Sequence, residues 1–161
     1  NIIYRGTDCG FRIKSAIPRK GFIRNIYLNN LTMIDVKYLF HIYLNWNPLY
    51  SICKLPDDYN GEILPHYQAL TTKTIGENTN IDNIYIKNVK AILSKDYKGI
   101  ARAFMIVGFN DRHINNLNFK NIDITAFEYG KIEFVDNLKF TSFKINVMNA
   151  YEEANDEYDN R

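Results

Sequence analysis

The chain has 161 residues, of which 46% are hydrophobic, enough for one domain with a hydrophobic core. No apolar run approaches the roughly 20 residues that a membrane-spanning helix needs, and the modest glycine and proline content excludes a low-complexity chain. The net charge of +2 is unevenly spread, because residues 1–40 carry seven basic side chains against two acidic ones. A basic N-terminal part suits an anionic partner.

The first predicted element is a short basic strand at residues 10–15, which read G-F-R-I-K-S. Successive side chains of a strand point to opposite faces, so Phe11 and Ile13 should face a core, and Arg12 and Lys14 the outside. The two cations would lie roughly 7 Å apart, a spacing that suits a carboxylate-bearing sugar. The pattern by itself favours the simpler alternative, an amphipathic strand with a solvated outer face.

A nine-residue pattern then recurs four times. Its order is apolar, any residue, Asn, apolar, any residue, apolar, any residue, Asn or Ser, apolar. This alternation is typical of a strand with one buried face and does not match a helical stripe. The copies occupy residues 23–31, 81–89, 114–122 and 135–143, with Asn25, Asn83, Asn116 and Asn137 at the third position.

The spacing between the copies indicates how they assemble. The third-position asparagines are 58, 33 and 21 residues apart, which predicts coils of a solenoid with loops of different length. In a parallel β-helix the asparagines would lie at corners and bond to one another in a ladder. A β-sandwich with similar strands is the alternative. The expected inward stacks are Ile26, Ile84, Leu117 and Leu138, and next to them Leu28, Ile86, Phe119 and Phe140.

Further strands are expected between the copies, at residues 39–44, 101–107 and 132–134, each forming another face of a coil. The insertion of about residues 47–78 holds three of the four prolines and lacks periodicity. Loops of this length are often functional. The domain predicted for residues 1–150 is therefore a set of coils with one long loop, and residues 151–161 form an acidic solvated tail.

The basic strand also carries a family resemblance. The segment G10-F-R-I-K-S15 resembles the Gly-x-Arg-Ile-Lys-Ser/Thr segment of polygalacturonases, glycoside hydrolase family twenty-eight. A basic turn, R19-K-G21, and an N-I-x-L-x-N strand follow it as in that family. Residues 38–51, Y-L-F-H-I-Y-L-N-W-N-P-L-Y-S, are similar to a strand and turn of bacterial members. The resemblance covers about residues 5–148.

The resemblance implies an all-β fold, a right-handed parallel β-helix, of which this chain holds the C-terminal coils. It implies hydrolysis of α-1,4-linked galacturonan or related pectic chains with inversion, without metal or cofactor, in secreted or periplasmic proteins. Arg12 and Lys14 match the family residues that bind the galacturonate carboxylate. Trp46 stands where the family commonly has an aromatic residue, and its ring could stack on a sugar. Packing of Trp46 against the long loop is the alternative.

The carboxyl groups that the family uses for catalysis are not matched here. Inverting glycosidases need one acid for the leaving oxygen and one carboxylate that activates water, and the family places both upstream of the Arg-Ile-Lys strand. Asp57 and Asp58 lie downstream, in the long loop. We expect no catalytic residue in this chain and no hydrolysis by the chain alone, either because the catalytic coils are missing or because it is a degenerate remnant. A non-catalytic carbohydrate-binding or structural solenoid is the alternative function.

The remaining reactive side chains indicate no further site. His41, His66 and His113 are scattered, and we expect each to be structural or solvated. Cys9 and Cys53 form no C-x-x-C pair, so we expect both to be free and buried, with a disulfide as the alternative. No nucleic-acid motif, metal site or cofactor motif is recognised.

The expected partner is a pectic polysaccharide or oligogalacturonide, with no nucleic acid and no membrane. A β-helix cut across its coils exposes backbone groups and apolar core at the cut, and solenoids need polar caps. Residues 1–10 carry little that could cap. We therefore expect a short irregular cap, poor solubility, or an end-to-end homodimer through the N-terminal coil.

Overall fold

The computed structural model describes residues 1–16, 20–46, 58–62 and 77–148. All regular secondary structure in these ranges is β-strand, arranged in two sheets. The first sheet runs, in spatial order, through β1 (Ile2–Arg5), β3 (Phe22–Ile34), β5 (Asn80–Ile92), β7 (Ile114–Ala126) and β10 (Lys139–Val147), with β9 (Val135–Asp136) also paired to β7. The second sheet runs through β2 (Cys9–Ala16), β4 (Tyr38–Trp46), β6 (Arg102–Val107) and β8 (Glu128–Glu133).

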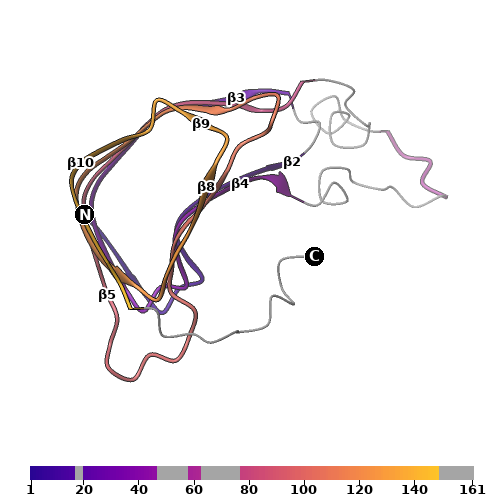
Figure 1. The fold of residues 1–161 in the computed structure, drawn as a ribbon. Coiled ribbons are helices and arrows are strands. Elements are labelled where there is room, and N and C mark those ends of the chain that lie inside the picture. The colour runs from indigo at the N-terminus through magenta and orange to yellow at the C-terminus, as the bar shows by residue number, and fades with distance from the viewer. Residues whose placement is uncertain (17–19, 47–57, 63–76, 149–161) are drawn as a thin grey trace.

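The chain alternates between the two sheets, and every pair of named strands is parallel. Successive strands of each sheet superimpose when seen end-on (Figure 1). The expected all-β fold is therefore confirmed, with parallel sheets. The strands predicted at 39–44 and 101–107 lie in β4 and β6. The strand predicted at 132–134 begins earlier, at Glu128, and ends before Phe134.

The repeat asparagines lie where the strands of the first sheet bend. Asn25, Asn83, Asn116 and Asn137 all have φ between 53° and 60°, a left-handed conformation that asparagine tolerates better than most residues. The eighth position of each copy bends in the same way, at Asn30, Asn88, Asn121 and Ser142. The repeat therefore encodes two backbone bends in each copy.

The predicted amide ladder is present. Asn116 Nδ2 donates to Asn83 Oδ1 at 2.6 Å, and Asn83 Nδ2 donates to Asn25 Oδ1 at 3.2 Å. The ladder shifts at its far end, because Asn137 donates to Asn115 and not to Asn116. A second ladder joins Asn121 to Asn88 at 2.6 Å and Asn88 to Asn29 at 2.8 Å.

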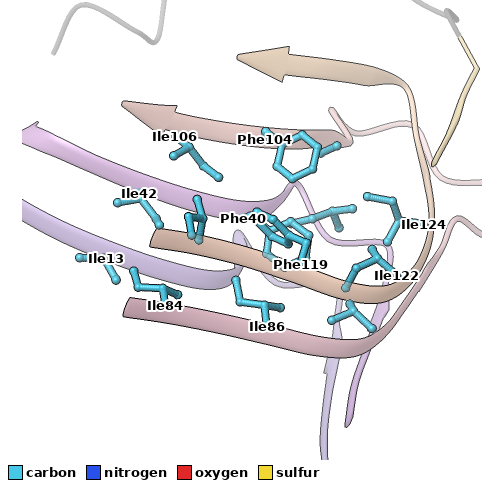
Figure 2. Close-up of a cluster of buried hydrophobic side chains, with 14 of the residues drawn as sticks. Ile13, Phe40, Ile42, Ile84, Ile86, Phe104, Ile106, Phe119, Ile122 and Ile124 are labelled. Atoms are coloured by element: carbon cyan, nitrogen blue, oxygen red, sulfur yellow. The ribbon is translucent and has the colours of Figure 1, made fainter. Parts of the chain in front are cut away.

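The hydrophobic core lies between the inner faces of the two sheets (Figure 2). The predicted stack of Leu28, Ile86, Phe119 and Phe140 appears in the strand register, although Phe140 is 38% exposed. In the other predicted stack, Ile26 pairs with Ile84 and Ile84 with Leu117, whereas Leu138 lies outside the paired residues of β10. In the second sheet, the register places Phe11, Phe40 and Phe104 in line, with Ile13, Ile42 and Ile106 beside them. The rings of Phe104 and Phe119 meet edge-on across the core at 5.5 Å.

The N-terminal end of the chain is regular. Residues 2–5 form strand β1, which pairs with Leu31–Ile34 of β3, so a short irregular cap, one of the three alternatives expected for this end, is not found there. Most of the long loop of residues 47–78 and the tail of residues 151–161 lie outside the described residues. No described helix could cross a membrane.

Candidate functional site

Strand β2 places its basic side chains on the outer face of the second sheet. Ile13 is only 8% exposed and Phe11 packs against the core, whereas Lys14 is exposed and the Arg12 side chain is 30% exposed. This alternation is the one that the sequence predicts. The register sets His41 beside Arg12 and Tyr43 beside Lys14 on β4.

Arg12 is held from two sides. Its Nη2 donates to Asp8 Oδ2 at 2.6 Å, and its Nε donates to His41 Nδ1 at 2.9 Å. A guanidinium has five N–H donors in a planar fork, and the bonds to Asp8 and His41 use two of them. An arginine fixed in this way can bind a carboxylate with little loss of side-chain freedom.

The carboxyl group of Asp8 is tuned by its neighbours. Partial burial alone would raise the pKa of Asp8, but the hydrogen bond and charge of Arg12 outweigh it, with help from Cys9 and Lys37. The pKa of Asp8 therefore lies below its usual value, and the group is an anion at neutral pH. A general acid of a glycosidase requires the opposite shift.

A row of rings lies next to Arg12 on β4. His41 is 7% exposed, and its ring stacks on Tyr38 at 5.2 Å and near Tyr43 at 6.3 Å between centroids. The sequence predicts a structural or solvated His41 and does not reveal its bond to Arg12. The shared alternation of β2 and β4 could have revealed it, had the pairing of these two strands been known.

Two more cations lie close to the ring of Tyr38. Lys37 Nζ lies 5.0 Å from the centre of the Tyr38 ring, and the Arg102 guanidinium lies 5.8 Å from it. Arg102 in turn donates from Nε to Glu128 Oε2 at 2.8 Å. We call this surface the basic face; its cations are Arg12, Lys14, Lys37 and Arg102, and its rings are Tyr38, His41 and Tyr43.

The third predicted binding residue is only partly placed. The backbone of Trp46 ends β4 and pairs with Ala16 at the end of β2, but its side chain lies outside the described structure. Asp57 and His66 lie outside it as well, and Asp58 is exposed. His113 lies away from the basic face, where its Nδ1 is 3.0 Å from Asp136 Oδ1.

Cys9 borders the basic face as a free thiol. It is half-buried where full burial was expected, and Cys53 lies outside the described residues. Its Sγ lies 3.6 Å from His41 Nδ1 and 3.5 Å from Asp8 Oδ2. Burial raises the pKa of the Cys9 thiol to about 12, so at neutral pH it is neither a thiolate nucleophile nor a thiolate ligand. Among the described residues, no group of three or more metal-ligating side chains could hold a metal ion.

The basic face thus combines a fixed arginine, an exposed lysine and stacked rings on a flat parallel sheet. Such a surface can bind an anionic chain through charge and ring contacts. No family model matches the chain, and no curated protein or solved structure matches it either.

Proposed function

We propose that this chain forms the C-terminal coils of a polygalacturonase-like protein and binds pectic, galacturonan-type polysaccharide on its basic face. The observation that carries the proposal is the outward pair Arg12 and Lys14, in which Arg12 is held by Asp8 and His41. The resemblance of the Gly-Phe-Arg-Ile-Lys-Ser segment to those enzymes supports it. Such proteins are secreted or periplasmic, and we propose the same compartment here.

The proposed fold is a right-handed parallel β-helix. Alternation of the chain between two parallel sheets and the stacked asparagine bends support this architecture. In such a solenoid, equivalent residues of neighbouring coils repeat at about 4.8 Å. The basic face would then be one wall of a substrate cleft.

The chemistry of galacturonan matches this surface. Each sugar of the unesterified chain carries one carboxylate, and the outer positions of β2 place two cations roughly 7 Å apart. The arginine fork suits one carboxylate bidentately and the lysine supplies a second charge. Trp46, at the end of the neighbouring strand, is proposed to contact a sugar ring.

We propose binding without hydrolysis for this segment. Within the part of the chain that the structure describes, the carboxyl groups of Asp8 and Glu128 border the basic face, and both are ion-paired, Asp8 with Arg12 and Glu128 with Arg102. An inverting glycosidase needs a protonated acid and a free base separated by roughly 6.5–9.5 Å. Neither of these two carboxyl groups has the environment of such an acid.

The test is calorimetric binding of trigalacturonate to the purified chain, with its fully methyl-esterified form as the neutral comparison. Arg12→Ala should weaken binding by roughly tenfold or more, because it removes a charge-assisted hydrogen bond. Arg12→Lys should recover only part of the affinity, because lysine lacks the fork. The control is Lys87→Ala, which removes an exposed cation from β5 in the other sheet.

Three outcomes would count against the proposal. Equal binding of the acid and the ester would show that carboxylates are not recognised. Equal losses for Arg12→Ala and Lys87→Ala would indicate unspecific attraction to a basic protein. Release of reducing sugar from polygalacturonate by the purified chain would contradict binding without hydrolysis.

We further propose a second copy of the chain as a partner at the N-terminal edge. Phe22 and Tyr27 of β3 are 64% and 69% exposed, and β1 pairs only with the far end of that strand. Tyr27 stacks on Tyr85 at 5.1 Å, so one of its ring faces is free to stack on a matching ring. Sedimentation that shows only monomer at high concentration, equally for the chain and for Tyr27→Ser, would contradict this partner.

A further inference from the structure

The hydrogen bond between Arg12 and His41 fixes the protonation state of the histidine. Arg12 Nε lies 2.9 Å from His41 Nδ1. A guanidinium offers only donors and stays protonated in proteins. His41 Nδ1 is therefore the acceptor, its ring proton lies on Nε2, and this contact exists only while the imidazole is neutral.

Protonation of His41 would place a second cation against Arg12. From β2 and the turn before it, the imidazole faces Arg12, Cys9 and Asp8, and Lys14 lies on the same outer face. Asp8 is already bound to Arg12 at 2.6 Å. The neighbours of His41 along its own strand, β4, are Tyr38 and Tyr43, with Lys37 just before them. On the next strand, β6, the neighbours are Met105, which pairs with His41, and Arg102.

The charge balance of these groups opposes a charged imidazole. Four cations face two carboxylates, and both carboxylates are already ion-paired, Asp8 with Arg12 and Glu128 with Arg102. His41 is only 7% exposed, so water screens the repulsion weakly. A proton on Nδ1 would also point at the N–H of Arg12, which removes the acceptor that holds it.

We infer that His41 is the positioning residue for Arg12, and that carboxylate binding on the basic face requires its neutral form. The identity of the ligand rests on the proposed function. With both anchors in place, the guanidinium presents its remaining N–H groups in a fixed direction. With His41 protonated, Asp8 alone holds Arg12, and the fork loses its direction.

The affinity for trigalacturonate should depend on pH in a range where the ligand itself does not change its charge. A buried histidine among cations gains its proton below the ordinary value of about 6.5, whereas sugar carboxylates stay charged down to about pH 3–4. Affinity for trigalacturonate should therefore fall roughly three- to tenfold between pH 7.5 and 4.5, the equivalent of one hydrogen bond.

Two substitutions at His41 separate positioning from simple structure. His41→Asn keeps an acceptor near the place of Nδ1 that does not titrate, so affinity should stay near the wild-type neutral value at every pH. His41→Phe keeps the ring stack but removes the acceptor, so affinity should be low and independent of pH. The control is His113→Asn, a histidine bonded to Asp136 away from the basic face, which should keep the wild-type profile.

A readout without ligand makes the inference independent of the proposed function. The Nε–H resonance of Arg12, assigned by its loss in Arg12→Lys, should lie downfield of a free arginine side chain at pH 7.5 and should move toward the free position as His41 gains its proton. In His41→Asn its position should stay unchanged down to pH 4.5. If trigalacturonate binds at no pH, the proposed function fails while this titration still decides the role of His41. An Nε–H chemical shift that stays unchanged down to pH 4.5 in the wild type, or equal pH profiles for wild type and His41→Asn, would overturn the inference.

Discussion

Substitutions of Asn83 test most directly whether the repeat asparagines stabilise the fold through their bends and their amide bonds. It lies in β5 with φ of 58°, accepts a hydrogen bond from Asn116 at 2.6 Å and donates one to Asn25 at 3.2 Å. Asn83→Gly keeps the bend but removes both bonds. At about 0.5–1.5 kcal/mol for each bond, with the exposed 3.2 Å bond at the low end, the free energy of unfolding should fall by about 1–2 kcal/mol. The added freedom of glycine in the unfolded chain costs about 0.5 kcal/mol more.

Asn83→Ala removes the same two bonds and adds backbone strain. A side chain with Cβ costs about 1–2 kcal/mol in the left-handed region, so alanine should be less stable than glycine despite its lower unfolded-state entropy. The expected order of stability is wild type, then glycine, then alanine. Urea unfolding followed by circular dichroism measures all three.

At a control position on the same strand, Lys87, the order of alanine and glycine should be the opposite. Lys87 is exposed and does not have a positive φ, so Lys87→Ala should be more stable than Lys87→Gly by about 0.5–1 kcal/mol. If alanine equals or exceeds glycine at Asn83 as well, backbone strain is not what the repeat asparagine relieves. If Asn83→Gly is as stable as wild type, the amide ladder contributes nothing.

Three further outcomes follow from the packing and the charges. Phe104→Ala removes a fully buried ring and should lower the free energy of unfolding by about 3–5 kcal/mol, measured by urea titration. Asp8→Asn should lower the unfolding midpoint near pH 7, and the difference should vanish as pH falls through the lowered pKa of Asp8, because the paired carboxylate stabilises only while ionised. In a Cys53→Ser background, iodoacetamide should alkylate folded Cys9 on the order of tenfold or more slowly than unfolded chain at pH 7.5; equal rates would contradict its raised pKa.

Local features of the chain could be predicted because each depends on neighbouring residues. The alternation of Phe11, Arg12, Ile13 and Lys14 determines which side chains face outward, since a strand has only two faces. The recurring asparagines predicted bends and a ladder, because asparagine tolerates a positive φ and carries both a donor and an acceptor.

The partners of the candidate site could not be predicted. His41 and Arg12 are 29 residues apart, and their bond depends on the register between β2 and β4. Loops of different length separate the strands, so no spacing in the sequence specifies that register.

The amino-acid sequence by itself therefore determined the strands, their buried faces, their bends and the outward direction of Arg12 and Lys14. The tertiary structure decided that Asp8 and His41 hold Arg12, that Arg102 and Lys37 join the same surface, and that Cys9 is half-buried beside them. The physical reason is the range of the forces. Hydrophobic alternation and backbone geometry act within a few residues, whereas the neighbours of a charged side chain are set by how distant strands pack.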